Sequence, residues 1–169
     1  MRHFLDRTYD VCAWIAGAFM VLILLNILVQ VAGSYFGLYI RGTDAYAGYS
    51  MAAASFFALA HTLKRGEHIR VTLILQRLAP VWRRRFEIGC LALAVILSAS
   101  FAWYSWSMVW WSYAFNAISD AQDKTPLWIP QLSMAIGVSV LFVAFLDELV
   151  AVAKGRQAAT AGAEPAHVE

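Results

Sequence analysis

The chain has 169 residues, of which 61% are hydrophobic and only 14% are charged. With a mean hydropathy of +0.60, it is far more apolar than a soluble domain of this length, so the composition predicts a membrane protein. The net charge is only +2, and the basic residues gather beside apolar runs, which argues against a nucleic-acid surface and favours a role in membrane topology.

The first apolar segment follows a short basic N-terminus. Residues 11–40 contain no charged side chain, and this run is much longer than the apolar core of a signal peptide. Because a membrane-spanning helix needs about 20 apolar residues, we expect a retained helix over about residues 11–34. Asn26 and Gln30 share one face of this helix and could form hydrogen bonds between helices. Packing within the chain is the simpler explanation for them.

A second span is predicted over about residues 45–63. Gly48 and Ala52 form a face of small residues, which permits close contact with another helix of this chain or of a partner. His61 is the one ionisable side chain, apart from cysteine, that clearly enters a predicted span. Haem-bearing membrane subunits need pairs of axial ligands, so a single histidine near a helix end favours an ordinary polar residue.

A basic segment follows the second span. Residues 63–85 contain seven of the thirteen Lys and Arg residues, and the apolar residues from Val71 to Leu78 recur with helical spacing. We therefore predict a short amphipathic helix over about residues 69–78 that lies flat at the membrane surface. The side chains expected near lipid phosphates are Arg70, Arg77, Arg83, Arg84 and Arg85. A solvated basic loop is the simpler alternative.

Two further spans are predicted, over about residues 88–117 and 127–146. Pro80 suits the first position of the third long helix. The uncharged stretch from Ile88 to Ser119 would be about 48 Å long as a helix, so it must tilt or extend beyond a hydrocarbon core about 30 Å thick. One side of this helix carries Trp103, Trp106 and Trp110, which would contact either lipid or a partner.

The basic residues also predict the orientation. Eleven Lys and Arg residues lie in the N-terminus, the segment between the second and third spans, and the C-terminal tail, whereas the other two loops contain only Arg41 and Lys124. Because basic loops stay inside, we expect a multi-pass membrane protein with both termini in the cytoplasm. Gly66 would then be cytoplasmic, and Gly42 and Gln122 would lie on the opposite side of the membrane.

The four predicted spans contain no Asp, Glu, Lys or Arg. Such residues usually mark proton relays and ion-coupling sites, so their absence argues against a self-sufficient proton-coupled carrier. The sequence has no nucleophile placed with a base and an orienting group, and therefore no enzyme activity is expected. Cys12 and Cys90 are too few and too far apart for a metal cluster, and we expect no bound cofactor.

Three motifs resemble a known family. They are RGEHIRV at 65–71, LQRLAPVWRRR at 75–85 and PLWIPQ at 126–131. Together with the four-helix layout, these stretches resemble the small membrane subunit, of DctQ type, of tripartite ATP-independent periplasmic (TRAP) transporters. These motifs also contain Arg65, Gly66, Glu67, His68, Pro126, Trp128, Pro130 and Gln131. The resemblance implies a protein of the bacterial inner membrane, with Gly42 and Gln122 on the periplasmic side. The resemblance covers about residues 1–154, which predicts one all-α membrane domain, and the composition of 155–169 predicts a disordered tail.

The resemblance implies a scaffold subunit without catalytic activity. Its expected partners are membrane phospholipids, a large membrane subunit of DctM type that carries substrate and Na⁺, and a periplasmic substrate-binding protein of DctP type. Such a system takes up organic acids, including dicarboxylates and sialic acids, by secondary active symport with Na⁺. The alternatives are a self-associating four-helix channel or small carrier, and a membrane anchor for a redox enzyme.

Overall fold

The computed structural model describes residues 2–38, 42–64, 80–121 and 123–154. These residues form four long helices: α1 (Arg2–Tyr35), α2 (Thr43–Lys64), α4 (Pro80–Ala114) and α5 (Trp128–Ala153). Within the same ranges, the only β-type pairing is an isolated bridge between Ile118 and Pro126. The prediction of an all-α protein is therefore confirmed.

Each predicted span corresponds to one of the four helices. Residues 11–34 and 45–63 lie within α1 and α2, and α4 begins at Pro80 as predicted. The expected third span, 88–117, extends three residues too far, because α4 ends at Ala114 and Asn116 turns the chain with a positive φ of 48°. Leu127 is the N-cap of α5 rather than its first residue. The predicted interfacial helix at 69–78 and the tail at 155–169 lie outside the described residues.

Three of the helices are long and apolar enough to cross a membrane. The candidate spans are Arg7–Tyr35 in α1, Arg84–Ala114 in α4, and Trp128–Ala153, which is the whole of α5. With 22 residues, α2 would be about 33 Å long, which matches the hydrocarbon thickness. It is less apolar because its sequence, TDAYAGYSMAAASFFALAHTLK, mixes Ser, Thr, Tyr and His with alanine.

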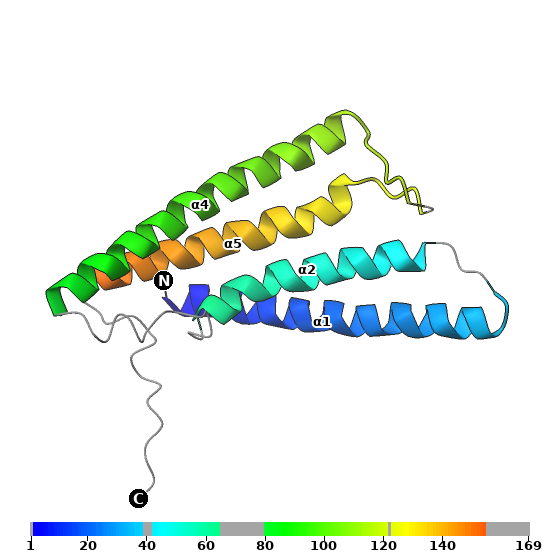
Figure 1. Ribbon diagram of the computed structural model, residues 1–169, viewed down its shortest axis with the longest axis horizontal. Coiled ribbons are helices and arrows are strands. Elements are labelled where there is room, and N and C mark those ends of the chain that lie inside the picture. The colour runs from blue at the N-terminus through cyan, green and yellow to red at the C-terminus, as the bar shows by residue number, and fades with distance from the viewer. Residues whose placement is uncertain (1, 39–41, 65–79, 122, 155–169) are drawn as a thin grey trace, which may run out of the picture.

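The helices lie side by side in the order α1, α2, α5, α4 (Figure 1). Helix α2 packs against α1 and α5, and α4 packs against α5. One buried cluster joins Tyr9 of α1, Leu63 of α2 and Ala144 of α5. A second cluster, of Leu91 and Val152, joins α4 to α5. The α1–α2 hairpin is therefore joined to the α4–α5 hairpin mainly by the contact between α2 and α5.

Gly137 lies at a close approach of α2 and α5. It is buried, and a Cβ atom added to it would lie 2.7 Å from the carbonyl oxygen of Phe56 and 2.8 Å from the Phe56 Cβ. Only glycine therefore lets the two backbones come so near. The Phe56 ring also lies near Phe101 of α4, with the ring centroids 6.3 Å apart.

Substitution of Gly137 by alanine should destabilise the bundle. The new methyl group would meet backbone atoms of Phe56, which cannot move aside without shifting α2, so we expect a loss of about 1–3 kcal/mol in the free energy of unfolding. Gly17→Ala is the matched control, because nothing lies within 4 Å of a Cβ at Gly17. That variant should be neutral or slightly stabilised. Thermal unfolding in detergent compares the two, and equal midpoints would refute the importance of this contact.

Candidate functional site

The described residues of the two short loops, 36–38, 42, 115–121 and 123–127, lie at one end of the bundle, which we call the short-loop end (Figure 1). The loop between α4 and α5 is a hairpin, because Ser119 N–H donates to the Thr125 carbonyl (2.9 Å) and Leu127 N–H to the Ala117 carbonyl (3.0 Å). The Tyr49 hydroxyl of α2 donates to Ser119 Oγ at 2.8 Å. The hairpin is thus attached to the first turns of α2.

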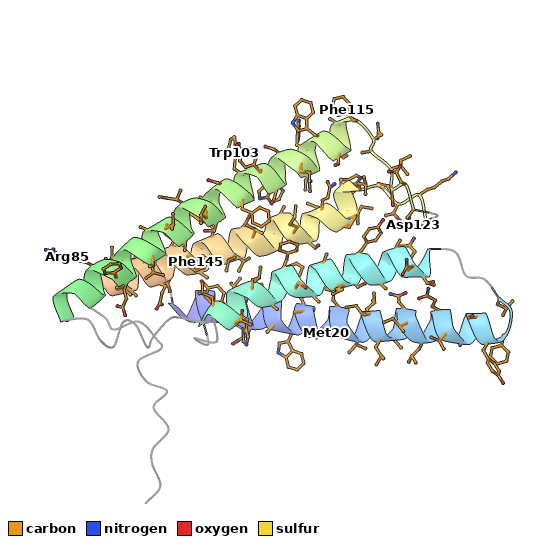
Figure 2. All side chains as sticks on the ribbon, in the orientation of Figure 1. Met20, Arg85, Trp103, Phe115, Asp123 and Phe145 are labelled. Carbon is orange, nitrogen blue, oxygen red and sulfur yellow. The ribbon has the colours of Figure 1, made fainter. Side chains whose placement is uncertain are left out.

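Asp123 lies at the centre of this attachment (Figure 2). Both of its carboxylate oxygens are shielded from solvent, and a Cβ on Gly42 would lie 3.0 Å from the Asp123 Cβ. The Thr125 hydroxyl lowers the pKa of Asp123 by favouring the charged carboxylate, burial acts in the opposite direction, and the Asp123 backbone N–H and the hydroxyls of Ser119 and Tyr49 lower the pKa further.

The Asp123 attachment was not predicted from the sequence. The turn-forming residues around Asp120 indicate only a loop, and tyrosines near the end of a membrane helix, such as Tyr46 and Tyr49, are typical of the membrane interface. Their contacts with Ser119 and Thr125 join residues 70 and 79 positions apart. No local pattern carries a signal for contacts at that separation.

Asn26 and Gln30, which were predicted to share a face, open into different cavities. Asn26 lines a cavity of about 410 Å³ with Tyr46, Tyr49 and Ser50 of α2 and with aliphatic side chains of α1. Gln30 lines a second cavity of about 410 Å³ with the polar residues Ser34, Thr43 and Asp44. The two amides are therefore placed in different surroundings on either side of the α1–α2 contact.

The small-residue face of α2 points away from the rest of the chain. Gly48 and Ala52 are exposed, and nothing lies within 4 Å of a Cβ built at Gly48. The buried side of α2 is formed instead by Ser50, Ala53, Ala54 and Phe57. Packing within the chain therefore does not account for Gly48 and Ala52, whose face is open to lipid or to a partner.

The tryptophan stripe of α4 is divided between two roles. Trp103 and Trp110 are 72% and 68% exposed, and Figure 2 shows Trp103 directed away from α5. Trp106 is also partly exposed, but its indole Nε1–H donates to Ser139 Oγ of α5 at 3.0 Å. One member of the stripe thus joins α4 to α5, and the others face outward.

The opposite end of the bundle, which we call the terminal end, holds the start of α1 and the finish of α5 (Figure 1). Here Arg84 Nη2 donates to the Ala153 carbonyl at 3.0 Å and satisfies one of the carbonyls left free at the end of α5. Arg84 and Arg85 are exposed. His61 Nδ1 lies 3.9 Å from an Asp10 carboxylate oxygen, so the predicted lone histidine has an acidic neighbour.

The family motifs are only partly described. Arg65, Gly66, Glu67, His68, Arg70 and Arg77 lie outside the described residues, and Arg83 falls in the first turn of α4. Pro126 joins the bridge with Ile118, and the Trp128 ring at the start of α5 meets Tyr113 edge to face, with centroids 6.0 Å apart. Pro130 and Gln131 occupy the first turn of α5. Residues 126–131 therefore connect the hairpin to α5.

The described residues contain no group of three or more His, Cys, Asp or Glu that could hold a metal ion. The two cysteines lie in different environments, because Cys12 is buried and Cys90 is exposed. The described residues instead present exposed apolar helix surface, the attachment of the hairpin to α2 at the short-loop end, and a cavity lined by the Asn26 amide.

Comparison with known families gives one match. The model of the family described as tripartite ATP-independent periplasmic transporters, DctQ component, matches residues 19–155. This range includes α2, α4 and α5 in full and half of α1. No curated protein matches the chain.

Proposed function

Because the chain belongs to the DctQ family of TRAP transporter components, we propose that it is the scaffold subunit, which moves no substrate itself and supports a large DctM-type subunit in the membrane. As a transporter component, it is not an enzyme. The complete system would take an organic acid from a DctP-type periplasmic binding protein and import it with Na⁺. The Na⁺ would be bound in the large subunit.

The family match over most of the chain carries this proposal, and the composition of the spans supports it. Between Val11 and Tyr35, Ile88 and Ala114, and Trp128 and Leu146, the sequence has no Asp, Glu, Lys or Arg. Ion-coupled carriers usually place such residues inside the membrane. Substrate and ion handling are therefore assigned to the partner. Membership of a transporter family also favours this role over a self-associating channel or small carrier.

The row of helices suits a supporting role because its two outermost helices have large open surfaces. Helix α1 exposes Met20, Val21, Leu24, Leu28 and Val31, and α4 exposes Leu93, Ile96, Leu97, Trp103 and Trp110. In a membrane such surfaces contact either acyl chains or another protein. We propose that part of this surface, together with the open face of Gly48 and Ala52, contacts the large subunit.

We also propose that α2 crosses the membrane, giving four spans, and that both termini are cytoplasmic. Helix α2 packs along both α1 and α5, which are candidate spans, and the basic residues are concentrated toward the terminal end. The short-loop end would then be periplasmic. Arg84 and Arg85 would lie near cytoplasmic lipid phosphates.

Single cysteines can test this orientation. In a background with Cys12→Ala and Cys90→Ala, we expect Ala121→Cys at the short-loop end to react with a membrane-impermeant maleimide added to intact spheroplasts. Lys154→Cys should react only after lysis. Both native residues are exposed, and Ala121 avoids the crowded site at Gly42. Labelling of Lys154→Cys in intact spheroplasts would contradict the proposed topology, because it would place the C-terminal end of α5 outside.

Purification tests the scaffold role directly. The chain, affinity-tagged and expressed with the membrane protein encoded beside it, should retain a much larger multi-span subunit through detergent solubilisation and size exclusion. A tagged membrane protein of unrelated family, expressed in the same way, controls for nonspecific retention. Recovery of this chain as a homo-oligomer free of any larger subunit would contradict the proposal and favour the channel or small carrier.

A further inference from the structure

The cavity beside Asn26 lies between α1 and α2, toward the short-loop end. It has a volume of about 410 Å³, and its lining includes Phe19, Leu22, Leu25 and Val29 of α1 with Tyr49 and Ser50 of α2. The α1 side of the cavity is apolar except for the Asn26 amide. An Asn side chain on a membrane helix commonly forms a hydrogen bond with another helix.

The Asn26 amide has no hydrogen-bond partner in the described part of the chain, and its polar neighbours form hydrogen bonds with other residues. Ser50 Oγ donates to the Tyr46 carbonyl at 2.7 Å. The Tyr49 hydroxyl donates to Ser119 at 2.8 Å, and the Tyr46 hydroxyl accepts from Thr125 at 3.4 Å. The amide therefore offers both a donor and an acceptor to an occupant of the cavity.

The depth of Asn26 distinguishes a protein occupant from a lipid. It lies nine residues before Tyr35, the last residue of α1, which is about 13 Å along the helix. A span of 29 residues is about 43 Å long, so Asn26 falls inside a hydrocarbon core about 30 Å thick. Lipid at this depth presents acyl chains, which cannot form a hydrogen bond with the amide. A neighbouring transmembrane helix can.

The apolar lining of the cavity is itself open. Leu22, Leu25 and Val29 line the cavity and remain 45%, 54% and 44% exposed. In a membrane such a surface is covered by acyl chains or by another helix.

We propose that a transmembrane helix of the large subunit docks here, placing a side chain in the cavity and a polar group against the Asn26 amide. This inference rests on the proposed function. It identifies which part of the chain contacts the partner, and it assigns Asn26 the role of fixing the position of the partner helix along α1.

Photo-crosslinking from adjacent residues tests the docking site. Leu25 lines the cavity, whereas Leu24 does not, and their exposures are closely matched at 54% and 56%. With benzoylphenylalanine at position 25 of the purified complex, we expect a covalent adduct with the large subunit, and at position 24 an adduct with lipid or none. Adducts of position 25 with lipid or with a second copy of the chain, or equal yields from the two positions, would overturn the inference.

Removal of the amide gives an independent readout. Asn26→Leu should weaken retention of the large subunit roughly three- to twentyfold on dilution in detergent, the range of one hydrogen bond between membrane helices. Gln30→Leu removes the same chemical group one turn away, in the other cavity, and should leave retention unchanged. Equal effects would refute a specific role for Asn26. If the wild-type chain retains no large subunit, the proposed function is wrong. If the wild-type chain retains it and Asn26→Leu does so equally well, only the docking site is wrong.

Discussion

The arrangement of the four helices depends on the close approach of α2 and α5 at Gly137. The α1–α2 and α4–α5 hairpins are each held together by contacts along their own helices, but what joins the hairpins is mainly the packing of α2 on α5. Where α2 meets α5 at Gly137, the Phe56 backbone occupies the space that any side chain at position 137 would need. At the short-loop end, the contact of Tyr49 with Ser119 adds a polar connection between the same two hairpins.

A row of helices fixed in this way leaves much of its apolar surface uncovered. Helix α2 is shared between two neighbours, whereas α1 and α4 pack extensively against only one each. A chain that carried substrate through its own centre would need polar groups there, and the sequence has no Asp, Glu, Lys or Arg in residues 11–35, 88–114 and 128–146. Open apolar surface on the outside of a packed bundle is a property expected of a subunit that supports a larger one.

Features that depend on local sequence were predictable, and features that depend on contacts between distant residues were not. Long apolar runs predicted the four helices, and Pro80 predicted the start of α4. The end of α4 was placed three residues late because residues 115–117 contain no charged side chain, and only the backbone turn at Asn116 reveals the boundary. Periodicity does not encode contacts between distant segments. It therefore did not predict the close approach at Gly137, the attachment of Asp123, or the placement of Asn26 and Gln30 in different cavities. The basic helix at 69–78 stays a prediction.

Transport by purified components tests the central claim most directly. The chain alone, the large subunit alone and their complex would be reconstituted into liposomes with an inward Na⁺ gradient, the cognate binding protein outside, and a panel of radiolabelled dicarboxylates and sialic acid. A scaffold subunit predicts uptake by the complex and none by this chain alone. Na⁺-dependent uptake into liposomes that contain only this chain would contradict the assignment.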